Sequence, residues 1–258
     1  MNRMEKILSE MKEQGQKIIV CYYPLCDTLL EDQVEWAGKY FENGTTVLEM
    51  GLPFEDPHLD GKTVQDSMSR ALSKYTVEDA FEVIRTLRAT YEDKILQVMT
   101  YYKIIDRMGI ESFAKRCADC GADAVLCPDI PKEKFPEMDR VLSSYGLLNL
   151  RFSPYHLSAE AEEDLIKNAK GYIFQQAVDG ATGMQKTVSP QVGINARRLK
   201  ELGINTPVLG GFGISNAQQA KEVCDMGTDG VIVGSAVITA IQNGKGEEFI
   251  RSLRMALD

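Results

Sequence analysis

The stretch Thr46-Val47-Leu48-Glu49-Met50-Gly51 decides the fold class, because runs of the same kind recur along the whole chain. It is short, aliphatic and nearly continuous in its apolar character, which is typical of a parallel strand covered by helices. The similar runs lie at residues 17–23, 46–51, 95–102, 122–128, 147–152, 171–177, 207–213 and 230–236. Segments with helical spacing separate them, for example 31–41, 76–90 and 110–120.

About eight strand–helix units in 258 residues predict a single α/β domain over residues 1–258, a (β/α)₈ TIM barrel. Residues 1–15 predict an extra helix before the barrel. An open doubly wound sheet is the alternative, but it favours a glycine-rich turn after the first strand, and residues 23–27 contain no glycine.

Several residues predict where the helices end or begin. Gly121, Gly203 and Gly227 follow helical patterns and are expected as C-caps. Ser215 with Gln218 predicts a capping box, and Ser189 precedes Pro190 at an expected first helical position.

The charge balance limits the classes of partner. The chain has 38 acidic and 29 basic residues, a net charge of −9, which disfavours nucleic acid and anionic membranes as partners. Residues 1–15 are polar and no apolar run is long enough to cross a bilayer, so a cytoplasmic protein with reduced thiols is expected. Cys117 and Cys120 form an isolated CxxC pattern, interpreted as buried thiols, and no metal site is expected.

Two carboxylates are candidates for chemistry. Strand alternation places Val47, Glu49 and Gly51 on one face, which directs Glu49 into the barrel near its upper rim. Burial raises the pKa of a carboxyl group and suits it for proton transfer near neutral pH. A structural carboxylate tied to a backbone amide is the alternative. Asp60 follows in a loop framed by prolines and Gly61, where a helix cap is the alternative role.

Glycines at two later strand ends predict a phosphate site. Residues 210–215 and 233–236 each end a strand and run into a helix, so backbone amides can approach an anion closely. Tight strand–helix packing is the alternative reading of these glycines. Residues 178–187 are polar and fit either a lid over a substrate or an ordinary loop.

The sequence EMGLPFEDPHLDGKTVQ, residues 49–65, resembles the pattern E-x-G-x-P-F-x-D-P-x-x-D-G of the tryptophan synthase alpha subunit family. Further matches to that family lie in order along the chain at residues 99–102, 129–131, 181–183, 211–215 and 234–235.

The resemblance implies a lyase of tryptophan biosynthesis that cleaves indole-3-glycerol phosphate to indole and glyceraldehyde 3-phosphate. Glu49 would be the general acid–base, and Asp60 would interact with the indole N–H. The implied phosphate-binding residues are Gly183, Phe212, Gly213, Gly234 and Ser235. The implied pocket residues are Tyr22, Met99, Tyr101, Leu126, Phe152, Phe174 and Thr182.

The resemblance also implies a partner. Indole would pass to a beta subunit in an α₂β₂ complex, with Pro53 and Asp56 at the interface. The cofactor pyridoxal phosphate (PLP) would lie in that beta subunit, and none is expected in this chain.

Three departures from the family pattern leave other functions open. Phe174 replaces a usual tyrosine, Lys103 replaces a usual asparagine, and Arg151 is charged within an apolar run. These are interpreted as pocket or docking-surface changes. The alternatives are a stand-alone lyase acting on a related phosphorylated substrate, a Schiff-base aldolase that uses Lys103, and a non-catalytic partner that only activates a beta subunit.

Overall fold

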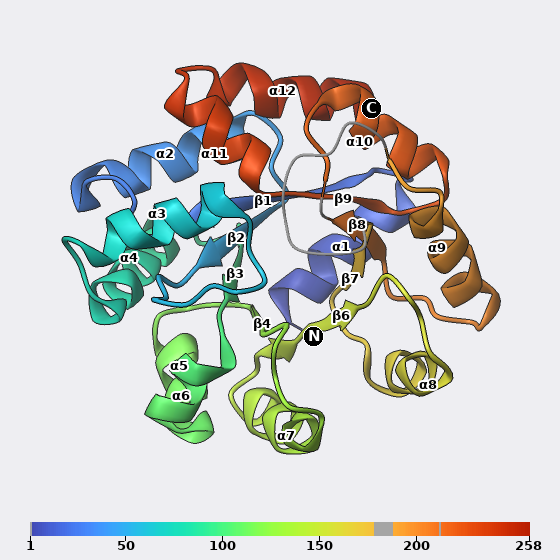
Figure 1. Ribbon diagram of the computed structural model, residues 1–258, viewed down its shortest axis with the longest axis horizontal. Helices are drawn as coiled ribbons and strands as arrows, with labels where there is room; N and C mark the ends of the chain where they lie inside the picture. Colours follow the sequence, from blue (N-terminus) through green and yellow to red (C-terminus); the bar gives the residue numbers. More distant parts are fainter. Residues whose placement is uncertain (1, 178–187, 212) are drawn as a thin grey trace.

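The strands form one parallel sheet wound into a barrel, and the helices surround it (Figure 1). The computed structural model describes residues 2–177, 188–211 and 213–258. The strand order is β5-β4-β3-β2-β1-β9-β8-β7-β6, so the first expected strand pairs with the last. This confirms the TIM barrel, and the open doubly wound alternative is wrong.

The strands have the following bounds: β1 (Ile18–Pro24), β2 (Val47–Gly51), β3 (Ile95–Met99), β4 (Ala124–Leu126), β5 (Leu148–Asn149), β6 (Arg151–Ser153), β7 (Ile173–Gln176), β8 (Val208–Gly211) and β9 (Gly230–Val233). The helices in the described ranges are α1 (Arg3–Glu13), α2 (Leu30–Glu42), α3 (Lys62–Leu72), α4 (Val77–Thr90), α5 (Tyr102–Met108), α6 (Ile110–Asp119), the 3₁₀ helix η1 (Lys132–Lys134), α7 (Phe135–Ser144), α8 (Ala159–Asn168), α9 (Gln191–Glu201), α10 (Ala217–Asp225), α11 (Ser235–Gln242) and α12 (Gly246–Leu257).

The fifth expected strand is divided. Its run contains β5 and β6, which lie on either side of Leu150. β5 pairs with β4, whereas β6 pairs with β7. Two short segments of one run therefore carry the sheet from β4 to β7, so nine short strands lie within the described residues where eight runs were expected.

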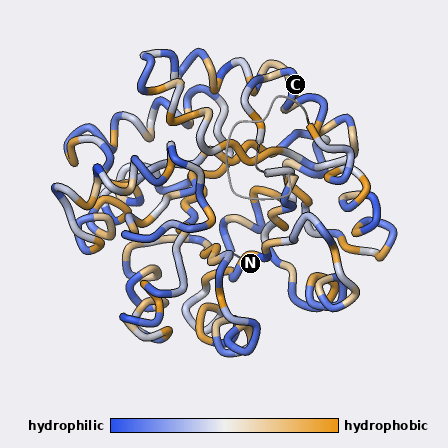
Figure 2. Tube along the Cα trace, in the orientation of Figure 1, coloured by the Kyte–Doolittle hydropathy of each residue, from blue (hydrophilic) through white to orange (hydrophobic). Residues whose placement is uncertain are grey.

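The inward faces of the strands form the core of the barrel. Figure 2 shows the hydrophobic residues gathered on the central strands, with polar residues on the outer sides of the helices. The inward residues include Ile18, Val20, Val47 and Ile95, and they form a buried cluster with Met4 and Leu8 of α1. The alternation that directs Val47 and Glu49 inward is confirmed. Val47 belongs to this inner cluster and Glu49 lines the cavity at the carboxyl ends of the strands, whereas Leu48 and Met50 pack in a separate buried cluster.

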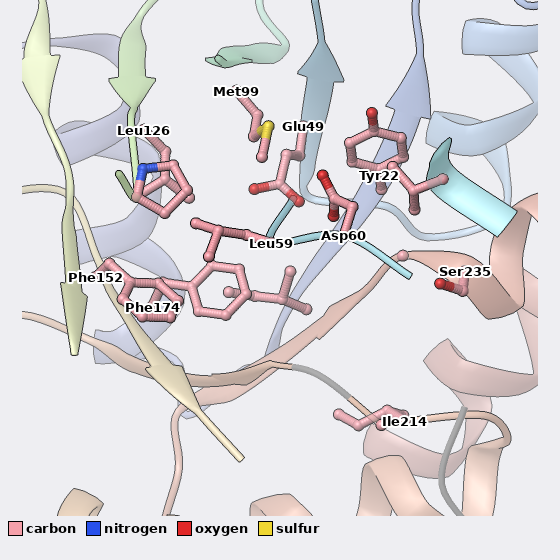
Figure 3. A pocket seen from close by; sticks show the side chains of 15 residues that line it. Tyr22, Glu49, Leu59, Asp60, Met99, Leu126, Phe152, Phe174, Ile214 and Ser235 are labelled. Atoms are coloured by element: carbon pink, nitrogen blue, oxygen red, sulfur yellow. The ribbon is translucent and has the colours of Figure 1, made fainter. Parts of the chain in front are cut away.

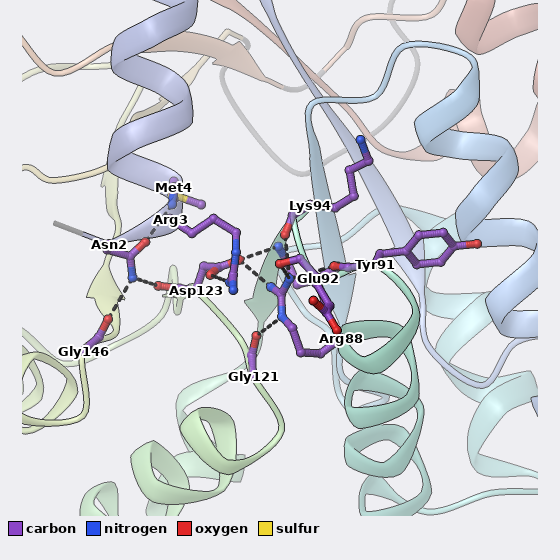
Figure 4. A network of polar contacts seen from close by, with 11 residues as sticks. Asn2, Arg3, Met4, Arg88, Tyr91, Glu92, Lys94, Gly121, Asp123 and Gly146 are labelled. Atoms are coloured by element: carbon purple, nitrogen blue, oxygen red, sulfur yellow. Dashed lines mark hydrogen bonds and ion pairs between the residues drawn. The ribbon is translucent and has the colours of Figure 1, made fainter.

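The extra helix expected before the barrel is present as α1, which lies across the centre of the ring of strands (Figure 1). Figure 4 shows how polar contacts hold it there. Asn2 caps α1 and donates to backbone oxygens of Asp123 and Gly146, at the amino-terminal ends of β4 and β5. The Asp123 carboxylate accepts from the side chains of Arg3 and Arg88. The end of the barrel opposite the carboxyl ends of the strands is therefore closed by α1.

The expected helix ends are partly confirmed. Gly121, Gly203 and Gly227 have φ values of 83°, 83° and 114°, which only glycine adopts readily. The capping box expected at Ser215 is wrong: the Asn216 side chain caps α10, because the Ser215 hydroxyl instead donates to the side chain of Gln219.

The first residues of α9 also differ by one position, because α9 begins at Gln191 and Pro190 takes the N-cap position. The expected strand 95–102 is too long. It ends at Met99, since the Tyr102 amide donates to the Asp129 carboxylate and begins α5.

Three further findings concern the cysteines, metal-binding clusters and membrane-spanning helices. Cys117 and Cys120 are buried free thiols on and beside α6, in agreement with their interpretation as structural residues. In the described ranges, no cluster of His, Cys, Asp and Glu side chains is arranged to hold a metal ion. None of the helices described is long and apolar enough to span a bilayer.

Candidate active site

A cavity opens at the carboxyl ends of the strands, where TIM barrels carry their active sites (Figure 3). The empty space within it, including solvent space at its open mouth, is about 680 Å³. The residues that line it are Tyr22, Glu49, Leu59, Asp60, Val64, Met99, Leu126, Pro128, Phe152, Phe174, Gly213, Ile214, Ile232, Gly234 and Ser235. Eight residues that the resemblance implies as catalytic or pocket groups lie in this cavity or beside it. They are Tyr22, Glu49, Asp60, Met99, Tyr101, Leu126, Phe152 and Phe174.

Glu49 projects from β2 into this cavity and is only 4% exposed. Burial raises its pKa to about 7, the charge of Asp60 adds to this rise, and a hydrogen bond from Gln97 opposes it. Nε2 of Gln97 donates to Oε1 of Glu49 over 3.1 Å. No lysine or arginine in the described ranges forms an ion pair with Glu49, so its carboxyl group can carry or release a proton near neutral pH.

Asp60 reaches the same cavity from the loop between β2 and α3, and Figure 3 shows its carboxylate beside that of Glu49. The Tyr101 hydroxyl donates to Oδ2 of Asp60 over 2.7 Å. Nε2 of Gln65 donates to the Asp60 backbone oxygen over 2.7 Å, which fixes the loop. The two carboxylates therefore have different surroundings, with a side-chain amide at Glu49 and a phenol at Asp60.

Tyr101 has a different position from the other pocket candidates. It is fully buried, stacks on Phe54 with 4.9 Å between ring centroids, and lies outside the residues that line the cavity. Its hydroxyl nevertheless contacts Asp60. Tyr101 thus supports a cavity residue from behind.

The remaining walls are apolar and suit a flat aromatic group. Phe152 and Phe174 lie 5.3 Å apart between ring centroids, and Met99 and Leu126 continue the wall. Phe174 lies over Gly211, where a Cβ atom would come within 2.4 Å of the ring. The sequence reasoning missed Leu59, Val64, Pro128, Ile214 and Ile232 as wall residues. Strand alternation was the available signal for Ile232, which is two residues from Gly234.

The glycine-rich strand ends form the other end of the cavity. Gly213, Gly234 and Ser235 all line it, and α11 begins at Ser235 directly after Gly234. Gly213 has a φ of 85°, a conformation that favours glycine. Helix amino termini and exposed backbone amides attract anions. Phe212, Gly183 and Thr182 lie outside the described residues, as does the rest of the segment 178–187.

The interpretation of Lys103 and Arg151 as pocket residues is wrong. Lys103 is the second residue of α5, has a side chain 55% exposed, and lies 3.6 Å from Glu55 rather than in the cavity. Arg151 is 1% exposed, but its guanidinium points away from the barrel interior and pairs with Asp139 of α7 and Asp164 of α8. The physical reason for Arg151 is strand alternation, because its neighbours Leu150 and Phe152 face inward.

The two candidate interface residues differ in exposure. Asp56 is exposed on the loop after β2, whereas Pro53 is buried in the isolated chain. The neighbouring Glu55 is also exposed and pairs with Arg107 of α5. Of the two, Asp56 is therefore accessible to a partner as the chain stands.

Comparison with known proteins decides the family. A family model described as Tryptophan synthase alpha chain matches residues 8–255. This chain belongs to the tryptophan synthase alpha chain family. The tryptophan synthase alpha chain of Archaeoglobus fulgidus is 34% identical over 239 residues, which cover 92% of this chain and 94% of that protein. That of Vibrio parahaemolyticus is 32% identical over 94% of this chain and 90% of its own length. The crystal structure of tryptophan synthase subunit alpha from Legionella pneumophila has a TM-score of 0.88 at 28% identity, with 100% and 99% of the two chains covered.

Membership in the tryptophan synthase alpha chain family confirms what the resemblance implied about class. The chain is a lyase of tryptophan biosynthesis built on a TIM barrel. Alpha chains of this family act on a small molecule, do not bind PLP themselves and usually work with a beta subunit.

Proposed function

We propose that this chain cleaves indole-3-glycerol phosphate into indole and glyceraldehyde 3-phosphate by a retro-aldol reaction. One observation carries the proposal: Glu49, a buried carboxyl group with a pKa of about 7, lies beside Asp60 in an apolar cavity that ends at Gly234 and Ser235. An aromatic ring fits the apolar walls, and a phosphate group fits the glycine end with its helix terminus.

Glu49 begins the reaction protonated. It gives its proton to the ring carbon that carries the side chain, and its carboxylate then removes the proton from the hydroxyl on the adjacent side-chain carbon. The carbon–carbon bond breaks, the aldehyde C=O forms, and the bonding electrons return to the ring. Protons and electrons balance, so one carboxyl group near its pKa serves both steps.

Asp60 stabilises the positive charge that develops at the ring nitrogen after protonation, by accepting a hydrogen bond from the ring N–H. The Tyr101 hydroxyl holds the Asp60 carboxylate for this role. Two neighbouring carboxyl groups with different partners thus divide acid–base and electrostatic work.

Gly213, Gly234 and Ser235 would hold the phosphate, with Gly183 and Phe212 from the resemblance. Tyr22, Met99, Leu126, Phe152 and Phe174 would surround the ring, and Thr182 would complete the pocket. The backbone amides at the start of α11 supply hydrogen bonds without a lysine, which is compatible with the net charge of −9.

The proposal includes a partner. Indole would pass to a beta subunit that carries PLP, in an α₂β₂ complex in the cytoplasm, and the exposed Asp56 together with Pro53 of the same loop would contact that subunit. Six free cysteines are compatible with a reducing compartment.

The test is to incubate the purified chain with indole-3-glycerol phosphate, with and without a beta subunit, and to measure indole. Release of indole supports the proposal. Release without a beta subunit favours the stand-alone lyase. No release in either condition, from folded protein, contradicts the proposed substrate and favours a related phosphorylated compound, as the loss of a hydroxyl at Phe174 would allow.

A further inference from the structure

A chain of two hydrogen bonds lies beneath Glu49. Register places Glu49 of β2 opposite Gln97 of β3. Nε2 of Gln97 donates to Oε1 of Glu49 over 3.1 Å, and the Tyr172 hydroxyl donates to Oε1 of Gln97 over 2.5 Å. Gln97 and Tyr172 are both fully buried and lie outside the cavity wall, so they act on the site only through Glu49.

The direction of these bonds is fixed by the chemistry of the groups. An amide has one acceptor end and one donor end. The Tyr172 hydroxyl donates to the carbonyl end of Gln97, which leaves the N–H end for Glu49. A flipped amide would direct its carbonyl oxygen at the carboxylate and leave buried polar groups without partners, at a large cost. Tyr172 therefore holds the orientation of the Gln97 amide.

The fixed amide decides which oxygen of Glu49 carries its proton. Oε1 of Glu49 faces an N–H donor, so a proton on Oε1 would oppose the donor's hydrogen. We propose that Gln97 and Tyr172 are positioning residues that keep the Glu49 proton on Oε2, the oxygen left for the substrate. This inference rests on the proposed function, since it specifies how the general acid of that reaction is held.

The proton transfer balances with no further reactant. The Oε2–H bond of Glu49 breaks as a C–H bond forms on the substrate ring, and the new negative charge is shared with Oε1, where Gln97 stabilises it. The hydroxyl proton of the substrate then returns to Oε2 as the carbon–carbon bond breaks. Hydrogen bonds to a charged acceptor are stronger than those to a neutral one, so the Gln97 bond strengthens as the proton leaves.

The other groups that face Glu49 cannot replace Gln97. The titratable groups that interact electrostatically with Glu49 are Cys21 and Tyr22 of β1, Asp60 after β2, and Tyr172 directly before β7. Asp60 is an acid. Burial raises the pKa of Cys21 to about 12 and raises the pKa values of the Tyr22 and Tyr172 phenols well above their usual value, which keeps these three groups neutral. Among the residues that the structure describes, Gln97 is thus the side chain that donates a hydrogen bond to the Glu49 carboxylate.

The experiment removes the donor and measures the titration of Glu49 directly. Protein labelled with ¹³C at glutamate carboxyl carbons is titrated by NMR, and Glu49→Gln assigns the signal. In Gln97→Met the titration midpoint of Glu49 is expected to rise by about one pH unit, because a hydrogen bond that stabilises the charged form is lost. At pH 5, where Glu49 is protonated in both proteins, kcat/KM for indole-3-glycerol phosphate should fall up to about tenfold, mainly in kcat, because the carboxylate that forms as the proton leaves has lost this hydrogen bond.

Tyr172 is tested by two variants. Tyr172→Phe frees the amide to reorient and should give a smaller shift in the same direction. Gln97→Met combined with Tyr172→Phe removes both partners, which avoids a lone buried hydroxyl and preserves folding. This double variant should keep the full shift in the midpoint.

Matched controls are available on the other side of β1. Gln33 is buried and its side chain bonds to the Cys26 amide and to Thr28, and the Tyr23 hydroxyl donates to the Gln33 backbone oxygen. Gln33→Met and Tyr23→Phe lose equivalent buried hydrogen bonds without touching Glu49. They should leave the Glu49 titration unchanged.

An unchanged Glu49 midpoint in the folded double variant overturns the inference. So does an equal loss of kcat in the control variants, since the effect would then be one of stability. If the wild-type chain releases no indole yet the midpoint moves in Gln97→Met and not in the controls, the proposed function fails whereas the positioning of Glu49 stands.

Discussion

Two carboxyl groups of this barrel are equally buried and serve opposite ends of it. Asp123 is 3% exposed at the end closed by α1, and Glu49 is 4% exposed at the open end. The Asp123 carboxylate accepts hydrogen bonds from the guanidinium groups of Arg3 and Arg88 (Figure 4) and from the backbone amide of Leu96. The Glu49 carboxylate accepts a hydrogen bond from the neutral side-chain amide of Gln97.

The difference shows that the partners of a buried carboxylate, and not its burial, separate a structural role from a chemical one. Positive partners compensate the charge of Asp123 and tie α1 to β3 and α4. Burial raises the pKa of both carboxyl groups, but the charges of Arg88 and Arg3 oppose the rise at Asp123, whereas a hydrogen bond from a neutral amide opposes it at Glu49. The pKa of Glu49 reaches about 7, a property that costs stability and suits proton transfer.

The largest expected effect is on catalysis at the open end. Glu49→Gln removes the proton donor while keeping the shape of the side chain, so indole release should fall about 10³-fold. The melting temperature should stay the same or rise, because a buried carboxyl group is replaced by a neutral amide. Steady-state assay and calorimetry on the same preparation measure both. If turnover persists above a tenth of wild type, Glu49 is not the acid–base group.

The second effect is the pH dependence of stability. The pKa of Glu49 is about 7 in the folded chain and about 4.3 when unfolded. The folded state therefore binds more protons between these values, and stability is lost as pH rises from about 4 to 7, by about 3 kcal/mol. Urea unfolding of wild type and Glu49→Gln is measured at pH 5 and pH 8. The free energy of unfolding of wild type should fall relative to that of the variant as pH rises. Equal differences at the two pH values would argue against the raised pKa.

The activity should follow the same titration. Because Glu49 must start protonated, kcat/KM should fall as pH rises through about 7. A pH profile of indole release measures it. An activity that rises through pH 7 instead would mean that Glu49 acts first as a base.

The third effect belongs to the closed end. Asp123→Asn leaves the partly buried Arg3 and Arg88 without their shared counter-ion, and the free energy of unfolding should fall by about 2–3 kcal/mol. The kcat of the folded fraction should stay the same, since this network lies at the opposite end of the strands from Glu49. Urea unfolding and active-site-normalised assay separate the two quantities. A loss of kcat at full folding would show that the ends are coupled.

The smallest effect is expected at Lys103. Its ammonium group is exposed and pairs with Glu55, an arrangement that contributes little to stability. Lys103→Met should change the free energy of unfolding by less than about 0.5 kcal/mol and leave indole release intact. Borohydride treatment with substrate should leave no adduct on Lys103. An adduct there, with loss of turnover in the variant, would restore the Schiff-base aldolase.

The sequence by itself determined the barrel, its extra helix, the family and the inward direction of Glu49. These follow from local information. Strands and helices have fixed periodicities, and a long contiguous motif such as residues 49–65 indicates the family without knowledge of the tertiary structure. Alternation would also have placed Arg151 outside the barrel, because Leu150 and Phe152 on either side of it are apolar.

Only the tertiary structure decided which distant side chains meet. Gln97 lies 48 residues from Glu49 in the chain, and Tyr172 lies 75 residues from Gln97, yet the wound sheet brings the three together. Tyr101 proved to lie behind Asp60 for the same reason. The pKa of a carboxyl group depends on burial and on its hydrogen-bond partners, which are set by strand register and barrel closure and are not written in any local stretch of sequence.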